Sequence, residues 1–192
     1  GRDDFVNGLN DAKRLVYNHY KTDKESSIVH NNLKDMKDVL TYSLQYQKGA
    51  WVLHMLRNYI GEDNFRKGIR NYYKKYYNST TTTNQFKTEM EVVSGMNLDT
   101  FFDQWLYKGG NMVLDGNWKF DEKKGRIEVN LNQVQNDGYL FEMPVELGIS
   151  YNDKNLEKIQ TVKLEKEKGR FYIASDSKPI SIKICLLYTS PS

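Results

Sequence analysis

The sequence predicts an α+β fold, with a helical first half and a second half of short antiparallel strands. Two observations predict it. Apolar residues recur at three- and four-residue spacing through residue 108, and at every second residue from Met112 onward. Between the two patterns lies Gly109-Gly110-Asn111, a stretch without apolar side chains. We therefore expect one unit at residues 1–109, a second at residues 110–184, and a tail at residues 185–192 that belongs to neither.

Five helices are predicted in the first half, from apolar residues that recur at helical spacing. Residues 44–60 are the most apolar of these segments and are expected to form a buried helix. Residues 21–38 are polar and are expected to form a loop. The five helices are predicted at residues 3–20, 44–60, 62–77, 82–95 and 99–108.

Local signals mark the ends of these helices. Gly61 lies where a left-handed residue would end the helix before it. Thr82 and Gln85 have the spacing of a capping box, in which each side chain binds the backbone amide of the other residue. On the helix of residues 62–77 the aromatic and aliphatic side chains share one broad face, which predicts that this face is buried. They are Phe65, Ile69, Tyr72, Tyr73 and Tyr76.

Six or seven short strands are predicted in the second half. Ile127, Val129 and Leu131 alternate with polar residues, and the same alternation recurs in four later segments. Turn-forming clusters such as Asn136-Asp137-Gly138 separate the segments. Short alternating strands with regular turns are typical of an antiparallel β-sandwich. The later segments carry Phe141, Met143, Val145, Leu147 and Ile149; Val162 and Leu164; Phe171 and Ile173; and Ile180, Ile182 and Ile184.

Composition limits the classes of function. The 28 lysines and arginines exceed the 25 acidic residues by three, and neither half is the dense basic block typical of a nucleic-acid-binding protein. No apolar run reaches the roughly 18 residues that a bilayer requires, so no transmembrane segment is expected. Cys185 is the single cysteine, which excludes an internal disulfide and a cluster of thiolate ligands.

Several motifs of other chemistry are absent or open to two interpretations. His19, His30 and His54 are far apart, and the chain has no H-E-x-x-H, C-x-x-C or phosphate-binding glycine motif. Residues 66–77 interleave basic and aromatic side chains, as segments that bind single-stranded nucleic acid do. The same spacing fits a helix with a core face and a solvated basic face, which we favour. Asn78-Ser79-Thr80 is an N-glycosylation sequon, a short pattern that often occurs by chance.

The most informative segment is Tyr46-Gln47-Lys48-Gly49-Ala50, inside the apolar helix. It resembles the Tyr-x-Lys-Gly-(Ala/Ser) segment of the aminopeptidase N family of zinc peptidases, the gluzincin aminopeptidases. The β half resembles the small sandwich that follows in that family, so the resemblance covers most of residues 28–184. Three further segments resemble the family in the same order: Ile28-Val29-His30, residues 82–90, and Phe101-Phe102-Asp103-Gln104-Trp105-Leu106.

The resemblance implies both a fold and a reaction. The fold would be the helical C-terminal half of a gluzincin catalytic domain, followed by its sandwich. The reaction would remove N-terminal residues from peptides by means of a zinc-activated water. By the resemblance Tyr46 is the catalytic residue, and its hydroxyl would donate a hydrogen bond to the tetrahedral oxyanion. A phenol is protonated at neutral pH and can donate. We expect structural roles for Lys48 and for Gly49, which would let the backbone pack closely.

The zinc-binding part of the family pattern does not occur in this chain. Its H-E-x-x-H, its downstream glutamate and its G-x-M-E-N segment are expected before Gly1, which makes the chain a C-terminal fragment. We expect zinc in a longer parent protein, no zinc bound by this chain, and no hydrolysis by the chain alone. The expected partner is a peptide substrate and not a nucleic acid. An alternative is a parent with this fold but no zinc motif, which would serve as a scaffold or binding protein. Residues 185–192 resemble translated sequencing-adaptor sequence and are expected not to be native.

Overall fold

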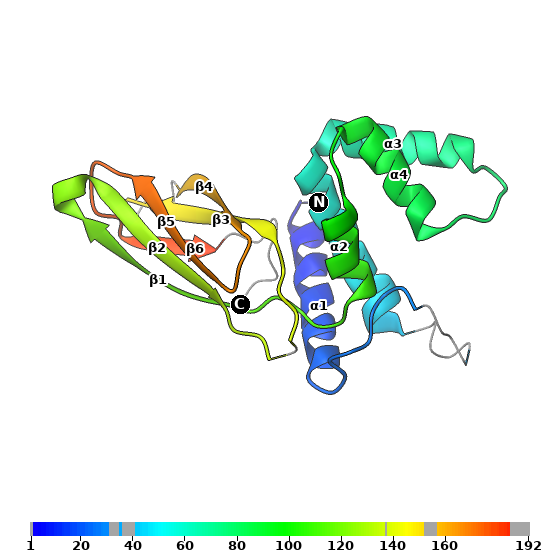
Figure 1. Ribbon diagram of the computed structural model, residues 1–192, viewed down its shortest axis with the longest axis horizontal. Helices are drawn as coiled ribbons and strands as arrows, with labels where there is room; N and C mark the ends of the chain where they lie inside the picture. The colour runs from blue at the N-terminus through cyan, green and yellow to red at the C-terminus, as the bar shows by residue number, and fades with distance from the viewer. Residues whose placement is uncertain (1, 31–34, 36–40, 137, 152–156, 185–192) are drawn as a thin grey trace. The chain divides into compact units, whose positions relative to one another are not determined.

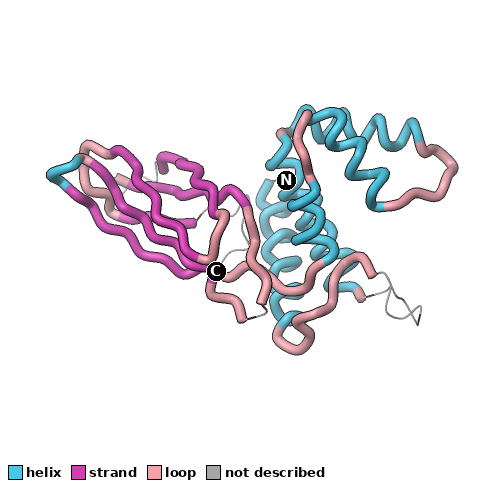
Figure 2. The backbone as a smooth tube through the Cα atoms, in the orientation of Figure 1, coloured by secondary structure: helices cyan, strands magenta, loops and turns pink. Residues whose placement is uncertain are grey.

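The structure is a computed structural model of the 192-residue chain, and it describes all residues except 1, 31–34, 36–40, 137, 152–156 and 185–192. The chain divides into two compact units, Gly1–Gly109 and Gly110–Ser192. The first unit is helical and the second consists of strands (Figure 2). The predicted α+β class is therefore confirmed. The predicted tail at residues 185–192, and much of the loop predicted at residues 21–38, lie outside the described residues.

The helical unit contains five α-helices and two π-helical segments among its described residues. Helix α1 packs against η2 and α2, while α3 and α4 pack against each other (Figure 1). Every helix predicted from the sequence has a counterpart here, displaced by a few residues at most. In order, the elements are α1 (Arg2–Tyr20), η2 (Tyr42–Lys48), α2 (Gly49–Ile60), α3 (Glu62–Lys75), α4 (Thr83–Ser94), α5 (Asp99–Phe102) and η3 (Asp103–Tyr107).

Helix α2 forms the centre of the core of the helical unit, as the apolar run at residues 44–60 predicts. Leu44, just before it in η2, packs with Val16 and Tyr20 of α1. Burying one such aliphatic side chain stabilises a fold by about 1.5–3 kcal/mol, so this cluster holds η2 against α1. The side chains of α2 that are buried are Trp51, Val52, Met55, Leu56 and Ile60.

The predicted helix at residues 44–60 begins with wider turns than an α-helix. The Gly49 N–H points to the carbonyl of Leu44, five residues earlier, as well as to that of Tyr46. Such i to i−5 bonds define a π-helix, which is rare and often found at functional sites. The apolar spacing of this segment gives no sign of the wider turns.

Gly61 ends α2 as predicted, but not in the predicted conformation. Its φ of 85° and ψ of 149° lie far from the left-handed helical region. Because α3 begins at the very next residue, Gly61 caps both helices and forms a one-residue corner. That corner requires a backbone conformation essentially confined to glycine.

The broad buried face predicted for residues 62–77 is present only in part, because Phe65, Tyr72 and Tyr76 are half-buried and none of the five predicted side chains is fully buried. Gly68 is the residue of α3 that is buried, whereas Ile69 is 37% exposed and Tyr73 is 66% exposed. Helix α3 meets α4 at Gly68, where an added Cβ would lie 2.6 Å from Sδ of Met90. The close approach is thus made by the residue without a side chain, and the described residues leave Ile69 and Tyr73 uncovered.

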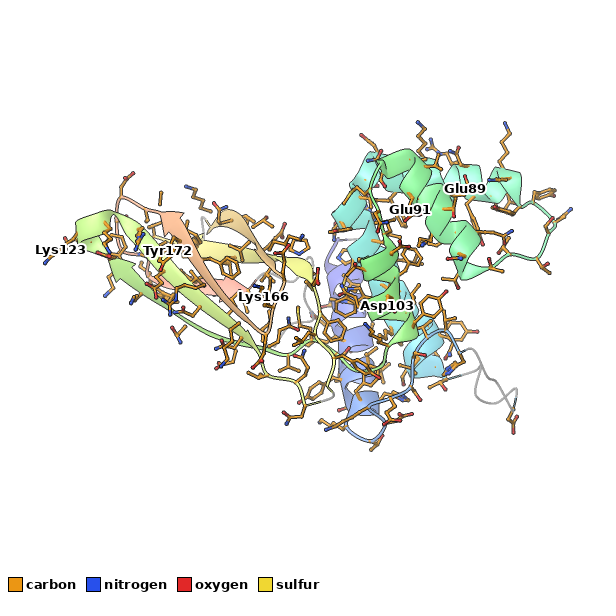
Figure 3. All side chains as sticks on the ribbon, viewed as in Figure 1. Glu89, Glu91, Asp103, Lys123, Lys166 and Tyr172 are labelled. Carbon is orange, nitrogen blue, oxygen red and sulfur yellow. The ribbon has the colours of Figure 1, made fainter. Side chains whose placement is uncertain are left out.

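Helix α4 has the predicted capping box. The Thr82 hydroxyl accepts a hydrogen bond from the Gln85 N–H at 3.3 Å, and the Gln85 side chain accepts one from the Thr82 N–H at 2.8 Å. Glu89 and Glu91 project from the same helix (Figure 3). Glu89 binds Lys75 of α3 at 2.6 Å, and Glu91 accepts the Leu98 N–H at 2.9 Å. These two bonds connect α4 to α3 and to the residue that precedes α5.

The strand unit consists of two three-stranded antiparallel sheets. One has the order β1-β2-β5 and the other β4-β3-β6, and the short helix η4 (Glu122–Lys124) joins β1 to β2. Alternate residues of β2 and of the first half of β3 are buried, and the last four residues of β3 are all buried. The two sheets with their buried side chains confirm the predicted sandwich. Ile180 is an exception, because it precedes β6 and is exposed. The strands are β1 (Leu114–Asp121), β2 (Arg126–Gln133), β3 (Met143–Ser150), β4 (Glu157–Leu164), β5 (Lys168–Ala174) and β6 (Ser181–Ile184).

Candidate active site

A cavity of about 550 Å³ lies in the helical unit beside η2 and α2. Most of its lining side chains are aliphatic or aromatic, and none of the described lining residues is acidic or basic. The cavity therefore offers apolar surface, with tyrosine and threonine hydroxyls and one glutamine amide as its polar side-chain groups. The lining residues are Ile28, Val29, Gln45, Tyr46, Gly49, Ala50, Val52, Leu53, Leu56, Tyr72, Thr81, Thr82, Thr83, Phe86, Phe102 and Leu106.

Tyr46 lies on η2 at this cavity and is 60% exposed. Tyr42, one turn earlier, is exposed to a similar degree but does not line the cavity. A side chain that lines a cavity and is open to solvent can meet a ligand there. The structure thus places the one residue selected from the sequence at a cavity, while the catalytic role of that residue stays a prediction.

The two residues after Gln47 behave differently from each other. Lys48 is 2% exposed, and its Nζ donates hydrogen bonds to the Tyr20 hydroxyl at 2.6 Å and to the Lys108 carbonyl at 3.4 Å. Gly49 was expected to permit close packing, and this is wrong. An added Cβ at Gly49 would lie 3.8 Å from its nearest neighbour, the Leu44 carbonyl, which is an ordinary contact.

The segments that resemble the family in sequence meet at this one cavity. The Val29 N–H donates a hydrogen bond to the Leu106 carbonyl at 2.9 Å, which joins the loop before residue 30 to η3. Thr82 and Phe86, from the capped helix α4, line the same space. Segments that lie between residues 28 and 106 therefore line one cavity beside Tyr46.

The part of the chain that the structure describes does not fit a zinc site. No three histidine, cysteine, aspartate or glutamate side chains within it lie close enough together to hold a metal ion. His19 lies 3.8 Å from Asp23, and His54 packs against the rings of Phe5 and Trp51. These histidines are thus engaged in local contacts within the helical unit.

Two more observations concern partners. Among the described helices, none combines the length and the apolar character needed to cross a bilayer. The basic and aromatic segment at residues 66–77 falls on α3 and the turn after it, where Arg66 pairs with Glu62 and Lys75 pairs with Glu89. Part of its positive charge is therefore neutralised within the helical unit.

Comparison with known proteins decides the family. The sequence model described as the peptidase family M1 domain matches residues 6–105, which is more than half of the chain. This chain belongs to peptidase family M1. The resemblance to zinc aminopeptidases that the sequence suggested is therefore confirmed, and the matched region contains Tyr46 and nearly all of the cavity lining.

Two relatives that match most of this chain are aminopeptidases by name. The chain is 30% identical over 141 residues to the probable aminopeptidase 2 of Sulfurisphaera tokodaii, which covers 73% of this chain and 17% of that protein. It is 25% identical over 158 residues to the leucyl aminopeptidase of Saccharolobus solfataricus, with 80% and 18% covered. The chain thus spans less than a fifth of the length of these relatives.

A solved structure shows the same fold. The crystal structure of Legionella pneumophila aminopeptidase A in complex with aspartic acid matches with a TM-score of 0.73. The match covers 93% of this chain and 21% of that chain, at 15% sequence identity. At this identity the likeness supports the fold of the M1 chain, including its strand unit, and not a substrate.

Sequence reasoning missed several residues that line the cavity. Gln45, Tyr72 and Phe86 line it. Tyr72 was assigned to a core face, and no role was predicted for Gln45, which precedes Tyr46, or for Phe86. Tyr72 meets Phe86 edge to face at 5.1 Å, so α3 and α4 close one side of the cavity together. Only the packing of the two helices reveals this, because no local motif marks such a pair.

Proposed function

We propose that this chain is the helical C-terminal part of a zinc aminopeptidase catalytic domain, at residues 1–109, with the β-sandwich that follows it, at residues 110–184. The observation that carries the proposal is the place of Tyr46 on η2, at the cavity where the family-like segments meet. Membership of the M1 family and the names of the relatives support the reaction class. The reaction is the removal of the N-terminal residue from a peptide, and the partner of the cavity is that peptide.

In this proposal Tyr46 acts on the tetrahedral intermediate of peptide hydrolysis. The carbonyl oxygen of the scissile bond becomes an oxyanion when the carbon becomes tetrahedral. A phenol O–H aimed at that oxygen stabilises the charge as it develops, and one such donor contributes roughly 10²–10³ in kcat. The open position of the Tyr46 side chain leaves room for the substrate to reach it.

Zinc belongs, in this proposal, to the longer protein and not to this chain. The described residues do not form a metal site, so its ligands would come from segments outside them. The chain by itself is therefore proposed to bind no catalytic zinc and to hydrolyse nothing. A peptidase assay of the isolated chain tests this, since measurable aminopeptidase activity would contradict it.

The test of the whole proposal is Tyr46→Phe in the longer protein that carries this chain, assayed on an aminoacyl arylamide. We expect kcat to fall by about 100-fold or more with little change in KM, because the bond forms chiefly in the transition state. Tyr42→Phe is the matched control and is expected to stay within about twofold of wild type. Wild-type kcat in the Tyr46→Phe variant would contradict the proposal. A folded wild-type protein without peptidase activity would instead favour the scaffold alternative.

A further inference from the structure

Tyr46 and Lys48 are two residues apart on η2, but one side chain is exposed and the other is buried. Tyr46 is open to the cavity, while Lys48 is almost fully buried on the inner side of η2. There the Lys48 Nζ bonds to the hydroxyl of Tyr20, the last residue of α1, and to the carbonyl of Lys108, just after η3. One side chain therefore ties η2 to the ends of two other helices.

The partners of Lys48 are themselves fixed. The Tyr20 hydroxyl donates a hydrogen bond to the Ser26 carbonyl at 3.0 Å. Gly109, next to Lys108, lies so close to the backbone of residues 24–25 that an added Cβ would be 2.5 Å from the Lys24 carbonyl oxygen. Residues 20–26 and 108–109 thus form a closely packed base, and Lys48 binds to both parts of it.

The segment that carries Tyr46 needs such support. It is a π-helix, whose wider turns are uncommon, and its N-cap residue Thr41 forms no side-chain cap bond. A buried amino group that loses its hydrogen-bond partners is costly, so the bonds of Lys48 favour one position of η2 over others. Catalytic groups lose rate steeply when they move, since a displacement of about 1 Å can cost roughly 100-fold.

We propose that Lys48 is a positioning residue, which acts through Tyr20 and the Lys108 carbonyl to hold η2 and thereby the Tyr46 hydroxyl in place. The inference rests on the proposed function of Tyr46. It gives the lysine of the Tyr-x-Lys-Gly segment a role distinct from both substrate binding and general stability.

The kinetic test is a double-mutant cycle in the longer protein that carries this chain. We expect Lys48→Met to lower kcat by about 10-fold or more, with KM changed less than about threefold. In the Tyr46→Phe background the same change is expected to cost no more than about twofold, because the hydroxyl that Lys48 positions is already gone. Equal losses in both backgrounds, or no loss in wild type, would overturn the proposal.

Two further variants complete the double-mutant cycle, one as a substitute for Lys48→Met and one as a control. Tyr20→Phe removes one partner of Lys48 without burying a new polar group, so it replaces Lys48→Met if that variant does not fold. We expect Tyr20→Phe to lower kcat less than Lys48→Met does. In the Tyr46→Phe background we expect no such fall. Lys75→Met is the matched control, because Lys75 Nζ also makes a 2.6 Å bond, to buried Glu89, away from η2. It is expected to leave kcat unchanged.

A spectroscopic measurement separates this proposal from that for Tyr46. With 3-fluorotyrosine at position 46, the ¹⁹F resonance is expected to shift or broaden in Lys48→Met and in Tyr20→Phe, but not in Lys75→Met. An unchanged resonance in the first two variants would overturn the positioning role whatever the kinetics show. If Tyr46→Phe keeps wild-type kcat, the proposed function fails, and the resonance still decides whether Lys48 positions the ring.

Discussion

The rings of Tyr42 and Tyr46 lie 5.7 Å apart on successive turns of η2, with exposures of 58% and 60%. Of the two, Tyr46 lines the cavity. The pair has the same chemistry and the same exposure on the same helix, and differs in what each ring faces. This makes Tyr42 an internal control for every experiment on Tyr46.

Gly109→Ala is expected to destabilise the helical unit. Its Cβ would meet backbone atoms of Lys24 and Glu25 at 2.5–2.7 Å, and backbone cannot move aside as a flexible side chain can. Overpacking of this kind is expected to lower the free energy of unfolding by about 1–3 kcal/mol. Urea unfolding followed by circular dichroism measures this difference.

Gly8→Ala is the control for that change. Gly8 lies within α1 with nothing within 4 Å of an added Cβ, so the substitution should stabilise the chain by up to about 1 kcal/mol through helix propensity. A shift of the free energy of unfolding in the same direction for both substitutions would show that Gly109 is not closely packed.

His54 is expected to make the helical unit less stable as the pH falls. Burial lowers the pKa of the His54 imidazole, and the nearby Arg57 lowers it further. The unfolded chain then takes up the proton first, at its ordinary pKa of about 6.5. The stability from neutral His54 is fully present above that pH and is lost as the pH falls toward the lower folded pKa.

The measurement is the free energy of unfolding of wild type minus that of His54→Leu, followed from about pH 8 to about pH 5. The subtraction removes the contribution of the carboxylates, which both proteins share. We expect the difference to move against wild type below about pH 6.5. A difference that stays constant with pH would show that His54 does not titrate as described.

Glu146→Gln is expected to stabilise the strand unit at neutral pH. Burial raises the pKa of the Glu146 carboxyl, and its Oε2 is buried with no hydrogen-bond partner among the described residues. A raised folded pKa means that wild-type stability is complete below the unfolded value of about 4.3 and falls as the pH rises through the folded pKa. The advantage of the amide should therefore appear in unfolding curves at neutral pH and vanish in acid.

Glu165→Gln is the control of opposite sign. The hydrogen bond from Lys163 lowers the pKa of the exposed Glu165 carboxyl, so the amide should give no gain at neutral pH. Equal gains from Glu146→Gln and Glu165→Gln would point to a general effect of net charge and not to burial.

Much of the fold can be predicted from the sequence, because its signals are local. The alternation at Ile127, Val129 and Leu131 and the capping box at Thr82 each depend on residues close together in the chain. The exposure of Ile69 and Tyr73 on α3 could not be predicted, since the same spacing of apolar residues occurs on covered and on uncovered helix faces. The contact at Gly68 decides the packing, and a missing side chain leaves no apolar signal.

The site was less accessible to sequence reasoning. Tyr46 could be selected only through its resemblance to a family segment, because it is one of 14 tyrosines in the chain. The buried bonds of Lys48 and the contact of Tyr72 with Phe86 join segments that are distant in sequence, and the wide turns of η2 do not follow from its apolar spacing. None of these leaves a periodic trace in the chain.

The role of Tyr46 can be measured without turnover, through the binding of a transition-state analogue to the longer protein. A phosphinic peptide carries a tetrahedral, negatively charged group in place of the scissile carbonyl. If Tyr46 stabilises the oxyanion, Tyr46→Phe weakens the affinity for this analogue by the factor by which it lowers kcat/KM, about 100-fold, while Tyr42→Phe changes it by less than about twofold. Equal affinity of wild type and Tyr46→Phe for the analogue would contradict the assignment of Tyr46.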